Sequence, residues 1–238
     1  MILEGGDPMS IFLIPPLILV FFGTLGAVMA GTTLPGTISG FKYLIFAFTA
    51  KKPDIEGVVE PLVKMAEKAR REGLLALESE MDSVEDPYMR RGLQMAVDGT
   101  DPDDLYEILT AEVKAIKAGA AAGSGFWTDA GGYAPTIGII GTVIGLIHVL
   151  ENLSEPEKLG HLIAGAFVAT LWGVLSANVM FLPWGKRIKN VVGMEAARME
   201  LIIDGVLAIQ AGANPRVVAT KLKAKMTPAG PGEVKEAA

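Results

Sequence analysis

The chain contains no cysteine, and only two of its 238 residues are histidine. The absence of cysteine excludes a disulfide framework and a thiolate metal site. His148 and His161 lie too far in sequence from clustered carboxylates to predict a zinc site. The net charge of −6 and the lack of a basic patch argue against nucleic-acid binding, which needs cationic side chains for phosphate contacts. The sequence predicts no metal, no cofactor and no nucleic-acid partner.

Catalytic groups are also missing. An enzyme needs a nucleophile, an acid/base pair or a metal cluster, and the sequence offers no such constellation. We therefore predict that the protein is not an enzyme. A passive membrane scaffold remains an alternative at this point.

Charge is absent from three long stretches, residues 8–41, 130–150 and 159–185. An uncharged apolar run of about 20 residues is long enough as a helix to cross the ~30 Å hydrocarbon core of a bilayer. No alternating strand pattern is present. The sequence therefore predicts an all-α integral membrane protein, whose transmembrane helices cover residues 15–41, 131–150 and 159–185.

Positively charged residues flank the inner end of each predicted span: Lys42, Lys51, Lys52, Lys114, Lys117, Lys186, Arg187 and Lys189. Such flanks face the cytoplasm. We therefore predict a cytoplasmic helical domain over 42–130 and cytoplasmic C-terminal helices over 186–227. Residues 1–14 and the short acidic loop 151–158 are then periplasmic. The tail 228–238, rich in Pro, Gly and Glu, is predicted to be disordered.

The N-terminus lies outside in this topology, although no span or signal precedes it. The first eight residues lack the basic region of a signal peptide. We therefore expect an upstream transmembrane helix that this sequence does not contain. The alternative is a three-span protein whose N-terminus is outside.

Helix signals mark the charged regions. Apolar residues recur at helical spacing from Val59 to Ala69, which predicts a helix from Pro53 to about Met81. Asp86-Pro87 and Asp101-Pro102 each combine a capping residue with proline, so two further helices are expected to begin there. The second is expected to continue toward the membrane, where Gly123, Gly125, Gly131 and Gly132 loosen the start of the second span.

Small residues recur four apart in every span, and such residues mark faces where membrane helices pack closely. They are Gly23, Ala27 and Gly31 in the first span, Gly141 and Gly145 in the second, and Ala169, Gly173 and Ala177 in the third. Three such faces favour a homo-oligomeric ring. Ordinary packing within one chain is the alternative.

Ionisable residues are absent from the core of every span. Because an ion pathway normally places such a group inside the membrane, another polypeptide would have to supply the carboxylate for any ion that crosses here. The spans do offer the hydroxyls of Thr142 and Thr170. Each is expected either to line a hydrated path or to bond the carbonyl four residues back in its own helix.

Pro135 and Pro183 lie near the inner ends of the second and third spans. Proline removes a backbone hydrogen bond and permits a bend. The pair predicts a hinge between the membrane and cytoplasmic parts, unless both prolines simply mark helix boundaries.

Four ordered motifs carry a resemblance to a known family: RREGLLALE (70–78), GLQMAVDG (92–99), AGGYAPTIGIIGTVIGLI (130–147) and LGHLIAGAFVATLWG (159–173). In this order and spacing they resemble the MotA family, the stator subunits of the bacterial flagellar motor. Members of that family have four spans, so the three spans here look like the last three of a four-span fold in the bacterial inner membrane.

The resemblance implies a pentameric ring of such subunits around a dimer of MotB, which carries the membrane aspartate and a peptidoglycan-binding domain. Ion flow would turn the ring, and its cytoplasmic loop would push on charged residues of the rotor protein FliG. The family's rotor-contacting pair falls on Arg70 and Glu78. Arg71, seven residues from Glu78, is the alternative arginine because the two would share a helix face more closely.

The same resemblance assigns conformational coupling to Pro135 and Pro183 and a pore-facing hydroxyl to Thr170. It implies a transported proton as the default, whereas threonine at position 142 is typical of sodium-driven relatives. The rival interpretation is an ExbB or TolQ-like energiser of outer-membrane processes. The motifs at 70–78 and 95–99 are closer to MotA.

Overall fold

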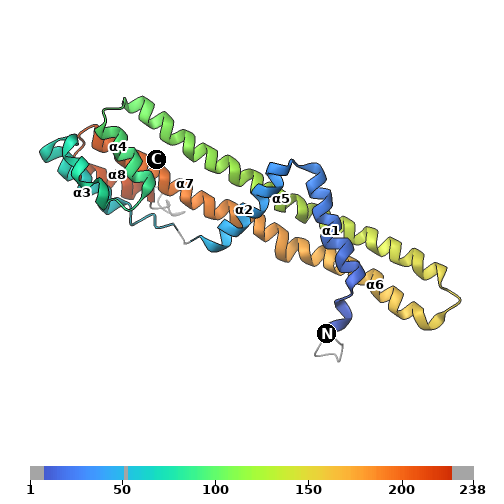
Figure 1. Cartoon of the computed structure of the whole chain (residues 1–238). Helices are drawn as coiled ribbons and strands as arrows, with labels where there is room; N and C mark the ends of the chain where they lie inside the picture. The colour runs from blue at the N-terminus through green and yellow to red at the C-terminus, as the bar shows by residue number, and fades with distance from the viewer. Residues whose placement is uncertain (1–7, 51–52, 227–238) are drawn as a thin grey trace, which may run out of the picture. The chain divides into compact units, whose positions relative to one another are not determined.

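The computed structural model describes residues 8–50 and 53–226, and every regular element in these ranges is helical. The α-helices are α1 (Ile14–Gly31), α2 (Leu34–Thr49), α3 (Val59–Glu72), α4 (Pro87–Val97), α5 (Pro102–Glu151), α6 (Pro156–Leu175), α7 (Leu182–Gln210) and α8 (Pro215–Met226). Two 3₁₀ helices, η2 (Pro8–Ile11) and the longer η3 (Leu74–Ser83), and one π-helical segment, η4 (Ser176–Phe181), complete the set (Figure 1). The predicted all-α fold is confirmed.

Three helices in these ranges are long and apolar enough to cross a membrane: Ile14–Gly31, Pro102–Glu151 and the continuous run Pro156–Gln210. The second and third contain the spans predicted over 131–150 and 159–185, and the first covers only residues 15–31 of the span predicted over 15–41. Many of their large apolar side chains are exposed, Phe22 at 72% for example, as expected of surfaces that face lipid.

The chain forms two compact units. We call residues 8–50 and 119–190 the membrane unit, and residues 53–118 and 191–226 the polar unit. These divisions differ from the predicted cytoplasmic ranges 42–130 and 186–227, because α2 packs against the part of α5 that follows Gly119. Residues 228–238, predicted to be disordered, lie outside the described residues.

The single helix predicted over 15–41 is in fact two helices. Helix α1 ends at Gly31, and Thr32 and Thr33 adopt extended backbone conformations before α2 begins. The Thr33 side chain accepts a hydrogen bond from the Gly36 N–H at 3.2 Å and caps α2, whose second residue is proline. The predicted span is therefore wrong beyond Gly31.

Helix α5 is continuous over 50 residues, so its glycines do not loosen it. Instead they allow close packing. A Cβ on Gly123 would lie 2.9 Å from the Cβ of Tyr43 on α2, and one on Gly131 would lie 2.5 Å from the Leu182 side chain. The expectation that Gly123, Gly125, Gly131 and Gly132 loosen the start of the second span is wrong, because α5 continues through all four. Gly123 and Gly131 bring neighbouring helices close, whereas an added Cβ on Gly125 or Gly132 would meet no described atom within 4 Å.

Aromatic side chains and an arginine hold α2 in the membrane unit. The indole N–H of Trp127 donates to the Gly40 carbonyl at 2.9 Å, and its ring meets those of Phe41 and Trp184. Near the end of α2, the Nε of Arg187 donates to the Ala47 carbonyl at 2.9 Å, and its guanidinium lies over the ring of Phe48. Each such aromatic pair contributes about 0.5–1.5 kcal/mol beyond its buried area.

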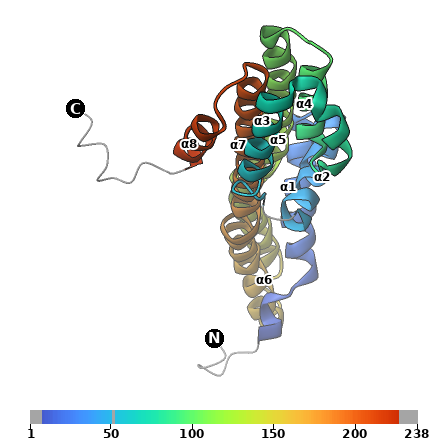
Figure 2. The ribbon, with the colours of Figure 1, turned by 90° about the vertical axis from the view of Figure 1, so that its left-hand side faces the viewer.

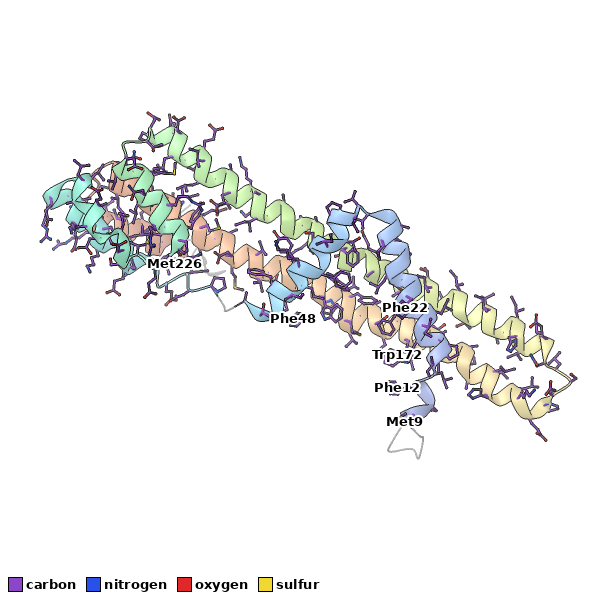
Figure 3. All side chains as sticks on the ribbon, viewed as in Figure 1. Met9, Phe12, Phe22, Phe48, Trp172 and Met226 are labelled. Atoms are coloured by element: carbon purple, nitrogen blue, oxygen red, sulfur yellow. The ribbon has the colours of Figure 1, made fainter. Side chains whose placement is uncertain are left out.

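Helices α5 and α6 form an antiparallel hairpin, joined by residues 152–155 rather than by the predicted loop 151–158 (Figure 1 and Figure 2). Helix α1 packs against α6. Just before α1 begins, the Ile11 carbonyl accepts a hydrogen bond from the indole N–H of Trp172 on α6 at 2.6 Å. The Trp172 ring lies 5.4 Å from that of Phe12 (Figure 3). Within the described residues, the N-terminal segment is thus tied to α6.

The polar unit has one hydrophobic core. The helical stripe predicted on α3 is buried there, namely Val59, Leu62, Met65, Ala66 and Ala69. Large side chains from the neighbouring elements complete the core, including Leu77, Leu93, Leu109, Ile202 and Leu222. Burying one such leucine contributes about 1.5–3 kcal/mol.

The predicted helix from 53 to 81 is shorter than expected. Helix α3 covers Val59–Glu72 and ends at Gly73, whose φ of +89° and ψ of 164° suit only glycine. The chain then continues as the 3₁₀ helix η3. Sequence periodicity did not detect this break because apolar residues continue on both sides of Gly73.

Candidate functional site

The hydroxyls of Thr142 on α5 and Thr170 on α6 meet inside the membrane unit and share a hydrogen bond. The Thr142 hydroxyl also lies 2.9 Å from the Ala166 carbonyl and 3.2 Å from that of Gly138, four residues back in its own helix. The Thr170 hydroxyl lies 3.4 Å from the same Gly138 carbonyl. Four neutral oxygen atoms therefore gather between two antiparallel helices.

This oxygen cluster has hydrogen-bonding capacity but no charge. Hydroxyl and carbonyl oxygens can accept a hydrogen bond or coordinate a hard cation, but they do not gain or lose a proton near neutral pH. No group of three or more His, Asp or Glu able to hold a metal is found within 8–50 and 53–226. The arrangement can line an ion path, and a proton carrier would have to come from elsewhere.

Close backbone contact between α5 and α6 brings the two threonines together. A Cβ on Gly138 would lie 2.8 Å from the Ala169 carbonyl oxygen, and one on Gly173 would lie 2.7 Å from the Ala134 carbonyl oxygen. Gly141 and Gly145 likewise face Ala169 and Ala166. Of the residues predicted to pack, Gly141, Gly145, Ala169, Gly173 and Ala177 lie in tight intramolecular contacts or are buried.

The first predicted stripe behaves differently. Gly23 meets Ile137, with 3.3 Å between its ideal Cβ and that side chain, but Ala27 and Gly31 are exposed. Nothing in the described chain lies within 4 Å of a Cβ on Gly31. Packing of α1 within the chain uses the neighbouring stripe of Val20, Thr24 and Val28, which is buried. Ala27 and Gly31 of the predicted stripe therefore pack against no other helix within the described residues.

Pro135 and Pro183 occupy different positions in their helices. Helix α5 continues through Pro135, whereas Pro183 follows the π-helical segment η4. There the Leu182 N–H bonds to the Ala177 carbonyl, five residues back. A π-turn followed by proline leaves backbone carbonyls without their usual helical partners and permits bending. The boundary alternative is thus wrong for Pro135.

The predicted rotor residues lie on two different elements. Arg70 and Arg71 end α3, while Glu78 is in η3 beyond the turn at Gly73, so no arginine shares a helix face with Glu78. Arg70 and Glu78 are exposed, and neither side chain has a hydrogen bond or ion pair with another described residue. Arg71 forms an exposed ion pair with Glu72 at 3.5 Å. Arg70 is consequently the freer of the two arginines.

A half-buried charge cluster in the polar unit was not predicted from the sequence. Arg198 on α7 pairs with Asp86 and with Glu195, the latter at 2.5 Å. Burial raises the pKa of the Glu195 carboxyl and lowers the pKa of the Arg198 guanidinium. Asp86 also caps α4 by accepting from the N–H groups of Tyr88 and Met89 at 2.8 and 2.9 Å. The sequence revealed the cap but gave no signal for Arg198, 112 residues away.

We expect Gly73→Ala to destabilise the protein, because an alanine at φ +89° is strained. The cost should be about 1–3 kcal/mol, seen as a lower Tm for thermal unfolding of the purified protein in detergent. Gly193→Ala is the matched control, since Gly193 is helical and a Cβ there meets no described atom within 4 Å. Equal Tm values for the two variants would show that the backbone at Gly73 is not strained by a side chain.

Comparison with known proteins decides the family. The MotA/TolQ/ExbB proton channel family matches residues 80–201, just over half of the chain. The chain belongs to this family. A proton channel family is not an enzyme class, and its members are inner-membrane proteins, so this family member is an inner-membrane protein. The part of it that the structure describes has three candidate spans.

Within the family, the chain is similar to flagellar motility proteins. It is 41% identical to Motility protein A of Bacillus subtilis over 72% of this chain and 64% of that protein. It is 35% identical to Motility protein A of Borreliella burgdorferi, over 87% of this chain and 79% of that one. The flagellar MotAB stator complex from Bacillus subtilis superposes with a TM-score of 0.87 at 35% identity, over 100% of this chain and 93% of that chain.

Proposed function

We propose that this chain is the stator subunit of a bacterial flagellar motor. It assembles as a ring around a MotB-type partner and couples ion flow to force on the rotor protein FliG. The likeness to a flagellar stator complex along the whole described chain carries this proposal. The uncharged oxygen cluster supports it, because a MotB-type partner would bring the carboxylate that the spans of this chain lack.

The ion path in this proposal runs along Thr142 and Thr170. Their half-buried hydroxyls and the Gly138 carbonyl lie between α5 and α6, where Gly138 and Gly173 bring the two backbones close. The ion is a proton by default. Because the Thr142 hydroxyl lies within hydrogen-bond distance of a carbonyl on each helix, it has a structural role that does not require sodium.

The ring in this proposal is pentameric and uses the exposed small residues of α1. Ala27 and Gly31 leave the backbone of α1 open to close approach by another helix. Pro135 and Pro183 allow α5 and the segment after η4 to bend as the ion passes, which couples the pathway to the rotor-facing residues Arg70 and Glu78.

Complementation of a stator-deletion strain tests the proposed function. The chain, joined to any upstream helix its gene encodes and expressed with a MotB-type partner, should restore swimming and give ion conductance in the membrane. The chain without that partner should conduct no ions. Failure to restore swimming, despite membrane insertion and partner binding, would contradict the stator assignment.

We expect Thr142→Ala to slow swimming only moderately and to leave ion preference unchanged. In the proton interpretation, the variant removes a hydroxyl bond between α5 and α6, worth about 0.5–1.5 kcal/mol. Swimming speed is measured against sodium concentration and against a protonophore. Thr136→Ala is the matched control, because the Thr136 hydroxyl bonds only its own helix, at the Tyr133 carbonyl. Sodium-dependent swimming that Thr142→Ala abolishes would assign sodium instead.

A further inference from the structure

Glu78 sits between two anchors of η3. On one side, Leu77 is fully buried in the core of the polar unit. On the other side, the ammonium of Lys68 donates to the Ser79 hydroxyl at 3.0 Å and to the Glu80 carboxylate at 2.7 Å. The Glu78 side chain itself is exposed. Its position is thus determined by the residues beside it in sequence.

Lys68 belongs to α3, the helix whose last turn carries Arg70 and Arg71. Its bonds to Ser79 and Glu80 cross the turn at Gly73 and join residues 11 and 12 positions apart. A 3₁₀ helix as long as η3 has poor internal hydrogen-bond geometry, so contacts with neighbouring elements have to hold it in place. Lys68 supplies such a contact from the helix that carries both arginines.

The Lys68–Glu80 pair is better placed than an ordinary surface ion pair. Its side chains are 21% and 28% exposed, so solvent screens the pair only in part. The hydrogen bond and the positive charge of Lys68 lower the pKa of the Glu80 carboxyl, as expected for a carboxylate that a cation contacts directly. The Ser83 hydroxyl, bonded to the Glu80 carbonyl at 2.7 Å, further fixes this residue.

The pair also shares a surface with a predicted rotor residue. Lys68 and Glu80 line a hollow of about 320 Å³ together with Arg71 and Glu72. The contact between α3 and η3 therefore lies beside Arg71, the residue that follows Arg70 in sequence.

We propose that Lys68 is a positioning residue for the rotor contact: through Ser79 and Glu80 it fixes Glu78 relative to Arg70. This inference rests on the proposed stator function. In this proposal Lys68 does not contact the rotor itself. It sets the distance between Arg70 and Glu78, which do. Electrostatic contacts of this kind determine register, so a loose spacing lowers the force transmitted.

The absence of cysteine from the chain allows a direct structural test. Spin labels are attached at Arg70→Cys and Glu78→Cys in the full stator complex, diluted with unlabelled subunits so that distances within one subunit dominate. We expect one narrow distance distribution in the parent and a broadened one with Lys68→Met. The charge exchange Lys68→Glu with Glu80→Lys should restore the narrow distribution. An unchanged distribution in Lys68→Met would overturn the inference.

The functional test measures torque per stator unit in single motors. Lys68→Met should lower it about two- to fivefold, the shift that an ion pair of this kind supplies, while partner binding and membrane levels stay unchanged. Lys68→Arg should keep most of the torque. Lys117→Met is the matched control, because it removes an ion pair of the same 2.7 Å length, to Glu200, elsewhere in the polar unit.

A double variant separates positioning from general destabilisation. If Lys68 acts through Glu78, adding Lys68→Met to Glu78→Gln should lower torque no further. Additive losses, or wild-type torque in Lys68→Met, would overturn the inference while the parent chain still swims. Absence of torque in the parent chain would overturn the stator function itself, and the inference with it.

Discussion

Gly173→Val is expected to abolish swimming by preventing correct assembly of the membrane unit. A Cβ at this position would lie 2.7 Å from the Ala134 carbonyl oxygen and 3.0 Å from the Gly138 Cα. Both are backbone atoms of α5, so no side-chain rotation can relieve the clash. Helices α5 and α6 would have to move apart, at a cost of about 1–3 kcal/mol or more, and Thr142 and Thr170 would separate with them.

Membrane level, partner binding and swimming speed measure the result for Gly173→Val. We expect partner binding and swimming to fall by tenfold or more, since about 1.4 kcal/mol corresponds to a factor of ten. Gly160→Val is the matched control in the same helix, because nothing in the described chain lies within 4 Å of a Cβ on Gly160. Normal swimming with Gly173→Val would show that the close α5–α6 contact is not needed for function.

The elements that the sequence predicted well are those with a local signal. The stripe on α3 from Val59 to Ala69 repeats at helical spacing and is buried. Asp86 and Pro87 predicted the start of α4, where the Asp86 carboxylate caps the helix. The uncharged runs likewise predicted the spans, because the bilayer imposes length and apolarity on each helix separately.

The helix breaks were harder to predict, because they depend on single residues in apolar surroundings. Gly73 ends α3 in a conformation that only glycine adopts readily, yet the same residue type packs inside the continuous α5 at Gly123 and Gly131. Glycine permits both outcomes, and the neighbouring helix decides between them. Composition alone could not distinguish a turn from a contact.

The candidate functional residues also fall into those that the sequence predicted and those that it did not. The sequence singled out Thr142 and Thr170 as the hydroxyls of interest in the second and third spans, and the structure brings these hydroxyls into contact. Periodicity did not reveal that Arg71 and Glu78 lie on separate elements. Nor did it reveal that Lys68 joins those elements, because an ion pair across a turn leaves no repeating pattern in the sequence.

Glu78→Lys is expected to stop rotation while leaving the protein folded and assembled. Glu78 is exposed and makes no hydrogen bond or ion pair with the rest of the described chain, so reversing its charge should change folding free energy by only about 0.5 kcal/mol. At a contact with a positive charge of the rotor, the same change replaces attraction by repulsion, and such like-charge contacts cost several kcal/mol.

Torque per stator unit, measured together with partner binding and ion conductance, distinguishes loss of the rotor contact from a defect in folding or assembly. We expect torque to fall by tenfold or more with Glu78→Lys, and to an intermediate value with Glu78→Gln, which removes attraction without adding repulsion. Asp82→Lys is the matched control: Asp82 is also exposed on η3, and its side chain has no hydrogen bond or ion pair within the described chain.

A compensating change on the rotor makes the Glu78 prediction specific. If Glu78 faces a rotor cation, reversing that cation to an acidic residue should restore torque to Glu78→Lys and should impair the parent chain. A contact set by charge requires this exchange, since the sign of the interaction depends on both partners. Normal torque in Glu78→Lys alone would exclude a rotor contact at this residue. It would shift attention to Arg70, the other exposed side chain of the pair without a partner in the described chain.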